Sequence, residues 1–200
     1  MIPLEIRFLN EHDDLSAVSR VYEQSWKYAY RGIIPQAFLD NIEQGRWSRN
    51  IVQPGRQSLL LLDEGRIVGT SSICPSRFED MAGYGEIISI YLLPEYMGKG
   101  CGVLLMNAAV DELFKMGFQD IFLYVLEENH RARRFYETFG FQPSGRSLQN
   151  DIGGKLLTEL QYVWHADEIT RREEIAKSLF GTLPDTCTLD EAHDERLSKI

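Results

Sequence analysis

The stretch that decides the fold is GEIISIYLLPEYMGKGCGVLLMN, residues 85–107. Its first half, Gly85 to Leu93, is rich in β-branched and aromatic residues and ends before Pro94, which is typical of a strand. Its second half opens a helical pattern that runs from Val103 to Met116. A glycine cluster, MGKGCG at residues 97–102, joins the two. The stretch therefore predicts a strand, a tight loop and a helix.

The glycine cluster has the chemistry of an anion site. Backbone N–H groups converge where a loop enters a helix, and glycine lets the backbone approach phosphate oxygens closely. A mononucleotide P-loop would need Ser or Thr after its lysine, whereas Gly100 follows Lys99. The dinucleotide fingerprint GxGxxG also fails, because the third glycine comes one residue early. The cluster is left as a pyrophosphate site without Mg²⁺, or as a plain turn.

The rest of the chain reads as alternating strands and helices. We expect strands at 4–9, 58–62, 67–74, 121–126, 141–145 and 156–164, and helices from Leu15, from Pro35 to about Asn50, and from Asn129. The strands at 58–62 and 67–74 flank DEGR, which predicts a hairpin. This order predicts an α/β (α+β mixed) fold with a mixed sheet and helices on both faces.

Composition and charge exclude several classes of protein. Hydrophobic residues make up 44% and charged residues 26% of the 200 residues, which suits one globular domain. A net charge of -9 would repel a phosphodiester backbone, so we expect no nucleic-acid partner. The longest apolar run, 121–126, is too short for a membrane span.

The cellular compartment and the metal content follow from other absences in the sequence. The start MIPLEIRFLN carries no basic segment before an apolar one, so we expect no secretory signal. Cys74, Cys101 and Cys187 are scattered and odd in number, which favours a reducing cytoplasm over a disulfide framework. These features predict a cytoplasmic protein. The four histidines show no metal-ligand spacing, so we also expect no bound metal.

The character of the chain changes after Trp164. Residues 165–200 carry no strand pattern, and the capping boxes TRRE at 170–173 and TLDE at 188–191 begin short helical patterns. We therefore divide the chain into a domain at 1–164 and an acidic helical C-terminal extension at 165–200. The apolar stripe of the extension needs a surface to cover, either its own domain or a partner chain, and a homodimer is one arrangement that provides it.

Two motifs together resemble the GNAT superfamily of acetyl-CoA-dependent N-acetyltransferases. They are ISIYLLPEYMGKGCGVLLMNAAV at 88–110 and LEENHRARRFYETFGFQP at 126–143, and SWKYAYRGIIPQAFLD at 25–40 is a weaker third match. The resemblance covers about residues 2–164. It implies a mostly antiparallel sheet of about six to seven strands, and transfer of an acetyl group from acetyl-CoA to a primary amine.

The resemblance also implies where acetyl-CoA would bind. The pantetheine arm would pair with the main chain of residues 90–92, and the pyrophosphate would lie over the loop at 97–102. Met97 stands where the family usually has Arg or Gln, which would weaken binding modestly. Asn129 would bond the arm, although an Asn directly before a helix is also an ordinary N-cap. The expected contacts are Ile90, Tyr91, Leu92, Met97, Gly98, Lys99, Gly100, Cys101, Gly102, Asn129 and Tyr136.

Four residues are implied to act on the reaction or to hold the acceptor. Tyr136 matches the tyrosine that protonates the departing thiolate, which suits a phenol titrating near ~10 and a thiol near ~8.5. Glu86 is the candidate base, with a solvated strand-end carboxylate as the alternative. Trp26 and Tyr30 lie in the expected acceptor wall, where aromatic faces attract a cation. Trp26 also shares a helical register with Tyr22, which fits core packing equally.

The acceptor stays open at this point. A small cationic amine is slightly favoured by the acidic net charge, and a peptide or protein amine is the other class. The competing function is a non-catalytic acyl-CoA-binding regulatory module whose tail docks a partner. A Tyr136→Phe variant separates the two, because only an enzyme would lose turnover.

Overall fold

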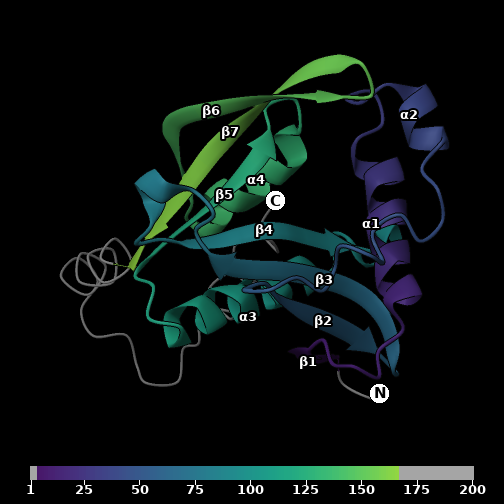
Figure 1. Ribbon diagram of the computed structural model, residues 1–200, viewed down its shortest axis with the longest axis horizontal. Coiled ribbons are helices and arrows are strands. Elements are labelled where there is room, and N and C mark those ends of the chain that lie inside the picture. The colour runs from purple at the N-terminus through teal and green to yellow at the C-terminus, as the bar shows by residue number, and fades with distance from the viewer. Residues whose placement is uncertain (1–3, 167–200) are drawn as a thin grey trace, which may run out of the picture. The chain divides into compact units, whose positions relative to one another are not determined.

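Residues 4–166 are described by the computed structural model, and they form one seven-stranded sheet with helices against it (Figure 1). The elements, in chain order, are β1 (Glu5–Phe8), α1 (Leu15–Ala29), α2 (Gln36–Asp40), β2 (Gln57–Asp63), β3 (Arg66–Pro75), η1 (Glu79–Met81), β4 (Gly85–Leu92), η2 (Pro94–Tyr96), α3 (Cys101–Lys115), β5 (Asp120–Leu126), α4 (His130–Phe139), β6 (Gln142–Ile152) and β7 (Lys155–His165), where η1 and η2 are short 3-10 helices.

The strand order is β1-β2-β3-β4-β5-β7-β6. The pairs β1–β2, β2–β3, β3–β4 and β6–β7 run antiparallel, whereas β4 and β5 run parallel. The parallel pair is expected from the long helical connection α3 between the two strands. The predicted mixed, mostly antiparallel α/β sheet is confirmed.

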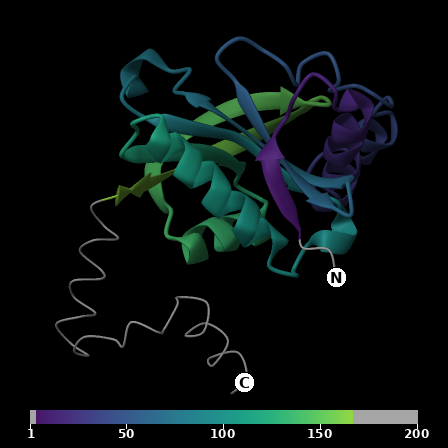
Figure 2. The same ribbon diagram turned by 90° about the horizontal axis from the view of Figure 1, so that it is seen from below.

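Helices pack on both faces of the sheet, as predicted. Helix α1 packs on β3 and β4, where the Tyr22 hydroxyl lies 3.2 Å from Ser72 Oγ and 3.0 Å from Ser89 Oγ. Helix α3 packs closely where β4 begins, since a Cβ on Gly85 would lie 2.9 Å from a Leu113 methyl group. Figure 2 shows α3, in teal, running along the sheet and α1, in purple, at a separate place on it.

The second helix is shorter than its pattern predicts. We expected helical structure up to about Asn50, but α2 ends at Asp40 and turns follow. The reason is that backbone N–H groups of this segment donate to side chains of α1 instead of to a helical carbonyl. Gly45 N–H donates to Glu23 Oε1 over 2.7 Å, and Trp47 N–H donates to Ser19 Oγ over 3.1 Å. Gly45 also has a φ of 78°, which interrupts a right-handed helix.

Two pairs of neighbouring strands are joined by tight hairpin turns. The β2–β3 hairpin is confirmed, with Glu64 and Gly65 at φ of 50° and 79° forming a two-residue turn that matches the strand twist. Strand β6 extends to Ile152, well beyond the predicted strand at 141–145, and it forms a hairpin with β7 that turns at Gly153-Gly154. Gly145 instead lies within β6, where the register shifts between Pro143 and Ser147.

The expected C-terminal extension falls almost wholly outside the described residues. His165 closes β7, and residues 167–200, with both capping boxes, are not described. The division at 164 and the homodimer contact therefore stay predictions.

Candidate active site

The site begins where two parallel strands part. Strands β4 and β5 pair over three residue pairs that end at Ile87 and Leu123, although the strands continue to Leu92 and Leu126. A bulge in the β3–β4 register leaves Ile88 without a partner on β3 at the point of separation. Bulges bend a strand and end regular pairing. Beyond this point the edge of β4 that faces β5 is open.

The main chain of this edge directs hydrogen-bonding groups into the opening. Leu93 N–H donates to Val68 O on β3 over 2.8 Å. Successive residues of a strand direct their peptide groups to alternate sides. The N–H and C=O groups of Ile90 and Leu92 therefore point away from β3, toward the opening. An extended ligand segment can pair with them like an added strand.

A cleft of about 810 Å³ occupies this opening. Its size suits a small-molecule or cosubstrate site, for which ~300–1,000 Å³ is usual. The predicted site residues that line it are Trp26, Tyr30, Glu86, Ile90, Tyr91, Leu92, Met97, Gly98, Gly100, Gly102, Asn129 and Tyr136. Lys99 and Cys101 do not line it: Lys99 is exposed, and Cys101 is buried with its thiol 4.0 Å from Lys99 O.

One end of the cleft is the glycine loop. Gly98 and Gly100 have φ of 75° and 80°, a left-handed conformation that favours glycine, and Gly100 is the N-cap of α3. In the part of the chain that the structure describes, no N–H from Gly98 to Gly102 donates to a backbone carbonyl. A Cβ on Gly98 or Gly100 would meet nothing within 4 Å. The loop therefore presents open donors at a helix N-terminus, which suits a pyrophosphate.

Helix α4 provides the middle of the cleft. Asn129 is its N-cap, with Oδ1 accepting from Ala132 N–H over 3.2 Å, so the structural role that we considered is present. The Tyr136 side chain is 9% exposed and packs against Phe135 and Phe141. Burial raises the pKa of Tyr136 above its ordinary value, and repulsion between its phenolate and that of Tyr91, if both were ionised, adds to this. Tyr136 therefore keeps its proton at neutral pH.

Aromatic side chains form the wall nearest α1. Trp26 and Tyr30 meet edge to face with centroids 5.0 Å apart, and the Tyr30 and Tyr91 hydroxyl oxygens lie 3.4 Å apart. Burial raises the pKa of Tyr91 to about 12 and that of Tyr30 well above its ordinary value, so neither is ionised at neutral pH. Trp26 also packs against Trp47 at 5.3 Å. It thus lines the cleft and contributes to the core.

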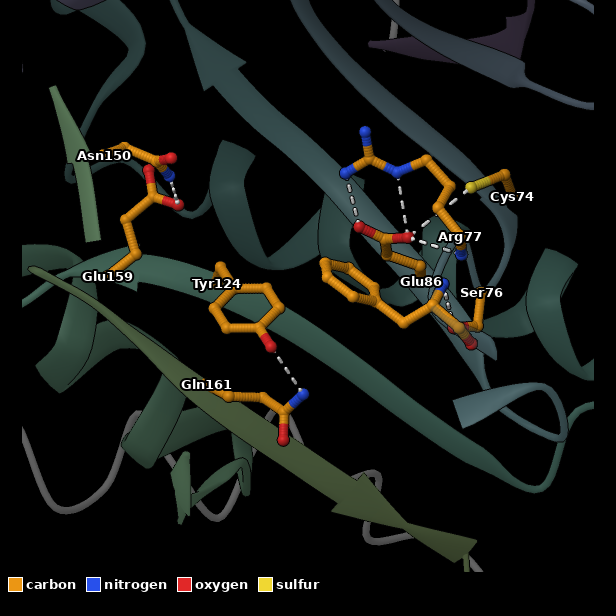
Figure 3. A network of polar contacts seen from close by, with 9 residues as sticks. Cys74, Ser76, Arg77, Glu86, Tyr124, Asn150, Glu159 and Gln161 are labelled. Atoms are coloured by element: carbon orange, nitrogen blue, oxygen red, sulfur yellow. Dashed lines mark hydrogen bonds and ion pairs between the residues drawn. The ribbon is translucent and has the colours of Figure 1, made fainter. Parts of the chain in front are cut away.

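Glu86 lies in the cleft but is already paired. Arg77 donates from Nη2 to Glu86 Oε1 over 2.6 Å and from Nε to Oε2 over 3.0 Å, and its backbone N–H reaches Oε2 over 3.2 Å (Figure 3). This pairing raises the pKa of Arg77. Burial, together with the charge of Glu86, raises the pKa of Cys74 to about 11. The base role of Glu86 stays a prediction, and sequence reasoning missed its partner Arg77.

Glu159 of β7 is a cleft carboxylate that sequence reasoning also missed. Asn150 Nδ2 donates to its Oε2 over 3.1 Å. Burial raises the pKa of Glu159 above its ordinary value, while the Asn150 hydrogen bond and the charge of Arg77 lower it. The sequence LLTELQYVWH at 156–165 contained a signal for this residue, because Glu159 lies on the same face of the strand as Leu157 and Val163. Both of these apolar residues are buried. A glutamate on a buried strand face is a functional indicator.

Residues 4–166 contain neither a metal-binding cluster nor a membrane-spanning helix. No group of three or more His, Cys, Asp or Glu side chains there is arranged to hold a metal ion. None of the helices in the same range has the length and apolar character needed to cross a bilayer.

Comparison with known families identifies the fold and the cleft region. The family model described as "Acetyltransferase (GNAT) family" matches residues 18–141. This range contains the parted strands, the glycine loop and Tyr136.

Among curated proteins, two relatives illustrate the similarity. The Bacillus subtilis (strain 168) protein "Uncharacterized N-acetyltransferase YuaI" is 29% identical over 159 residues, covering 76% of this chain and 88% of the relative. "Spermidine N(1)-acetyltransferase" from Thermoplasma acidophilum is 26% identical over 163 residues, covering 80% of this chain and 98% of the relative.

Among solved structures, the PaiA N-acetyltransferase from Thermoplasma acidophilum, crystallised in complex with coenzyme A, has the same fold. It superposes with a TM-score of 0.62 at 24% identity, covering 79% of this chain and 98% of that chain.

Proposed function

The chain belongs to the acetyltransferase (GNAT) family, and we propose that it transfers an acetyl group from acetyl-CoA to a small primary amine by direct attack. The observation that carries this proposal is the cleft between β4 and β5. It joins a loop of open N–H donors, a buried protonated tyrosine and an aromatic wall with carboxylates. These are the parts that acyl transfer from a phosphorylated thioester to an amine requires.

The residues fit acetyl-CoA as the cosubstrate. The N–H groups of residues 98–102 would hold the pyrophosphate, and the peptide groups of Ile90 and Leu92 would pair with the pantetheine amides. Asn129 would donate from its amide nitrogen, since its oxygen caps α4. Met97 lacks the polar side chain usual at this position, but the main-chain donors do not depend on it. The bound thioester supplies the electrophilic carbonyl carbon.

Tyr136 is the proposed acid. Attack by the amine forms the C–N bond and breaks the C–S bond, which leaves a thiolate that needs a proton. The Tyr136 phenol is still protonated at neutral pH because burial raises its pKa, and it faces the same cleft. A buried acid next to the leaving group shortens the lifetime of an unsolvated thiolate.

The acceptor is proposed to be a small cationic amine such as a polyamine. Trp26, Tyr30 and Tyr91 present aromatic faces and hydroxyl groups at this end of the cleft, and rings of this kind attract ammonium groups. The net charge of -9 would concentrate cations near the protein. The relative named as a spermidine N(1)-acetyltransferase supports the same class.

Calorimetry with acetyl-CoA and an assay of thiol release test this function. We expect micromolar binding, and thiol release with spermidine in preference to a lysine-containing peptide. Binding without release on any amine would favour the regulatory acyl-CoA-binding module. Absence of acetyl-CoA binding would mean that the glycine loop is only a turn between β4 and α3.

A matched pair of variants tests the loop itself. Gly98 and Gly145 have φ of 75° and 84°, and a Cβ on either would meet nothing within 4 Å. An alanine at each position therefore carries the same backbone strain of about 1 kcal/mol. Only Gly98 lines the cleft. We expect Gly98→Ala to weaken acetyl-CoA binding at least tenfold and Gly145→Ala to leave it unchanged. Equal acetyl-CoA affinities of the two variants would show that the loop does not bind the cosubstrate.

A further inference from the structure

Two cleft carboxylates in the described part of the chain have opposite surroundings. Glu86 is 1% exposed, and Arg77 compensates its charge through hydrogen bonds to each carboxylate oxygen. Glu159 is half-buried, makes no ion pair with a described residue, and accepts its hydrogen bond from the neutral amide of Asn150. Figure 3 shows the two carboxylates facing separate partners. The negative charge of Glu159 is therefore available to a cationic ligand.

The position of Glu159 suits a reacting amine. Its charge contributes to the raised pKa of Tyr30 and of Tyr91, and Tyr136 also contributes to that of Tyr30. Glu159 on β7 lines the same cleft as Tyr30, Tyr91 and the proposed acid on α4. Further along β7, Gln161 donates to the Tyr124 hydroxyl over 3.0 Å, so this face of the strand is directed at the cleft.

We propose that Glu159, rather than Glu86, binds the ammonium group of the acceptor and accepts its proton. This inference rests on the proposed function of amine acetylation. A protonated amine has no lone pair, so a group that both attracts the cation and takes a proton from it performs two steps at one place. Glu159 is free to do so because no described cation occupies it, whereas a new ammonium at Glu86 would have to displace Arg77.

The proton balance of the step is complete. The ammonium proton passes to Glu159, and the neutral nitrogen attacks the thioester carbonyl carbon. The C–N bond forms, the C–S bond breaks, and the thiolate takes the proton of Tyr136. The acetylated nitrogen gives up its second proton, which restores the tyrosine, and Glu159 releases its own proton to water. One proton is released for each amide formed.

The electrostatic surroundings make Glu159 a stronger base than a solvated carboxylate. Asn150 on β6 donates a hydrogen bond to Glu159, and the charge of Glu159 interacts with Tyr30 at the end of α1, Tyr91 on β4 and Arg77 after β3. The tyrosines stay neutral up to alkaline pH, so Arg77 is the charge that opposes the effect of burial, and burial outweighs it. A carboxylate with a raised pKa accepts a proton from an amine more readily.

The test compares Glu159→Gln with wild type on an amine that must lose a proton and on one that need not. Glutamine keeps the shape and still accepts from Asn150. With spermidine as the probe, only the neutral amine would react in the variant, about 4 in 10⁴ at pH 7 for an amine pKa near 10.4. We expect kcat/KM to fall by up to about 2,500-fold at pH 7, and by about 25-fold at pH 9.

The second amine separates proton acceptance from simple damage to the site. Aniline is neutral at pH 7, so we expect Glu159→Gln to change its acetylation less than threefold. Glu112→Gln, a half-buried position of α3 beside Lys115 and outside the cleft, is the control and should match wild type with each amine. Acetyl-CoA affinity and thermal unfolding verify that each variant is folded.

Several outcomes would overturn the proposal. One is a fall in kcat/KM on Glu159→Gln that is equal for spermidine and aniline, or that does not change with pH. Another is the same pH-dependent loss in Glu86→Gln but not in Glu159→Gln, which would return the role to Glu86. Wild-type protein that binds acetyl-CoA but acetylates neither amine would refute the proposed function instead. Glu159 is then tested by calorimetry with spermidine: a tenfold loss of affinity in Glu159→Gln supports ammonium binding, and equal affinity refutes it.

Discussion

Replacing Arg77 by methionine should destabilise the fold through the carboxylate that it leaves behind. Methionine keeps much of the apolar stem, so the change is chiefly the loss of the guanidinium. The Glu86 side chain is 2% exposed, and breaking a buried ion pair costs about 3–5 kcal/mol. The Arg77 side chain is 53% exposed, which weakens the pair by screening. We therefore expect a loss of about 2 kcal/mol in the free energy of unfolding.

Urea unfolding of four proteins measures this effect. In wild type, Arg77→Met, Glu86→Gln and the double variant, we expect a coupling energy of about 1–2 kcal/mol between the two sites. Arg77→Met alone should lower Tm by about 4–8 °C. Arg66→Met is the matched control, because Arg66 and Glu95 form a pair whose side chains are 55% and 48% exposed, and such pairs contribute about 0–1 kcal/mol.

Equal losses of unfolding free energy in Arg77→Met and Arg66→Met would contradict this prediction. An equal loss from Arg77→Met in the Glu86→Gln background and in wild type would also contradict it, since the uncompensated charge would then not be the cause. Either result would mean that Glu86 finds another donor or water when Arg77 is removed.

Three further predictions follow from the cleft and its surroundings. Tyr136→Phe should lower kcat about 10²–10³-fold while acetyl-CoA affinity, measured by calorimetry, changes less than threefold; unaltered turnover would remove its role as the acid. Glu159→Gln should raise Tm at pH 7 and the gain should shrink toward pH 4. Burial raises the folded-state pKa of Glu159, so its contribution to stability is present below the unfolded pKa of about 4.3 and is lost as the pH rises through the folded one. A lower Tm at pH 7 would contradict this. Cys74, whose pKa is raised to about 11, should react with iodoacetamide at pH 8 about 200-fold more slowly in the folded than in the unfolded protein, followed by peptide mass spectrometry; comparable rates would show that the thiol is accessible and ionised.

Local features of the fold were predictable because their causes lie within a few residues. Gly98 and Gly100 adopt left-handed backbone torsions that few other residues tolerate. Asn129 caps α4 through Ala132, three residues away. The family motifs added Tyr136, which lines the cleft with them.

The errors in the prediction arise where contacts between distant segments override a local pattern. The apolar spacing after Pro35 suggested a long helix, but Glu23 and Ser19 of α1 accept the N–H groups of Gly45 and Trp47. A pattern in one segment carries no information about acceptors supplied by another.

The sequence by itself determined the order of the elements, the glycine loop and the residues that match a family, because these depend on neighbouring residues and on short motifs. Only the tertiary structure decided which carboxylate is paired and which is not. Arg77, in the connection that follows β3, reaches Glu86 on the neighbouring strand β4, while Glu159 arrives in the same cleft from β7, far along the chain. The charge and pKa of a carboxylate depend on what the fold places around it, so its chemistry is set by the assembled cleft.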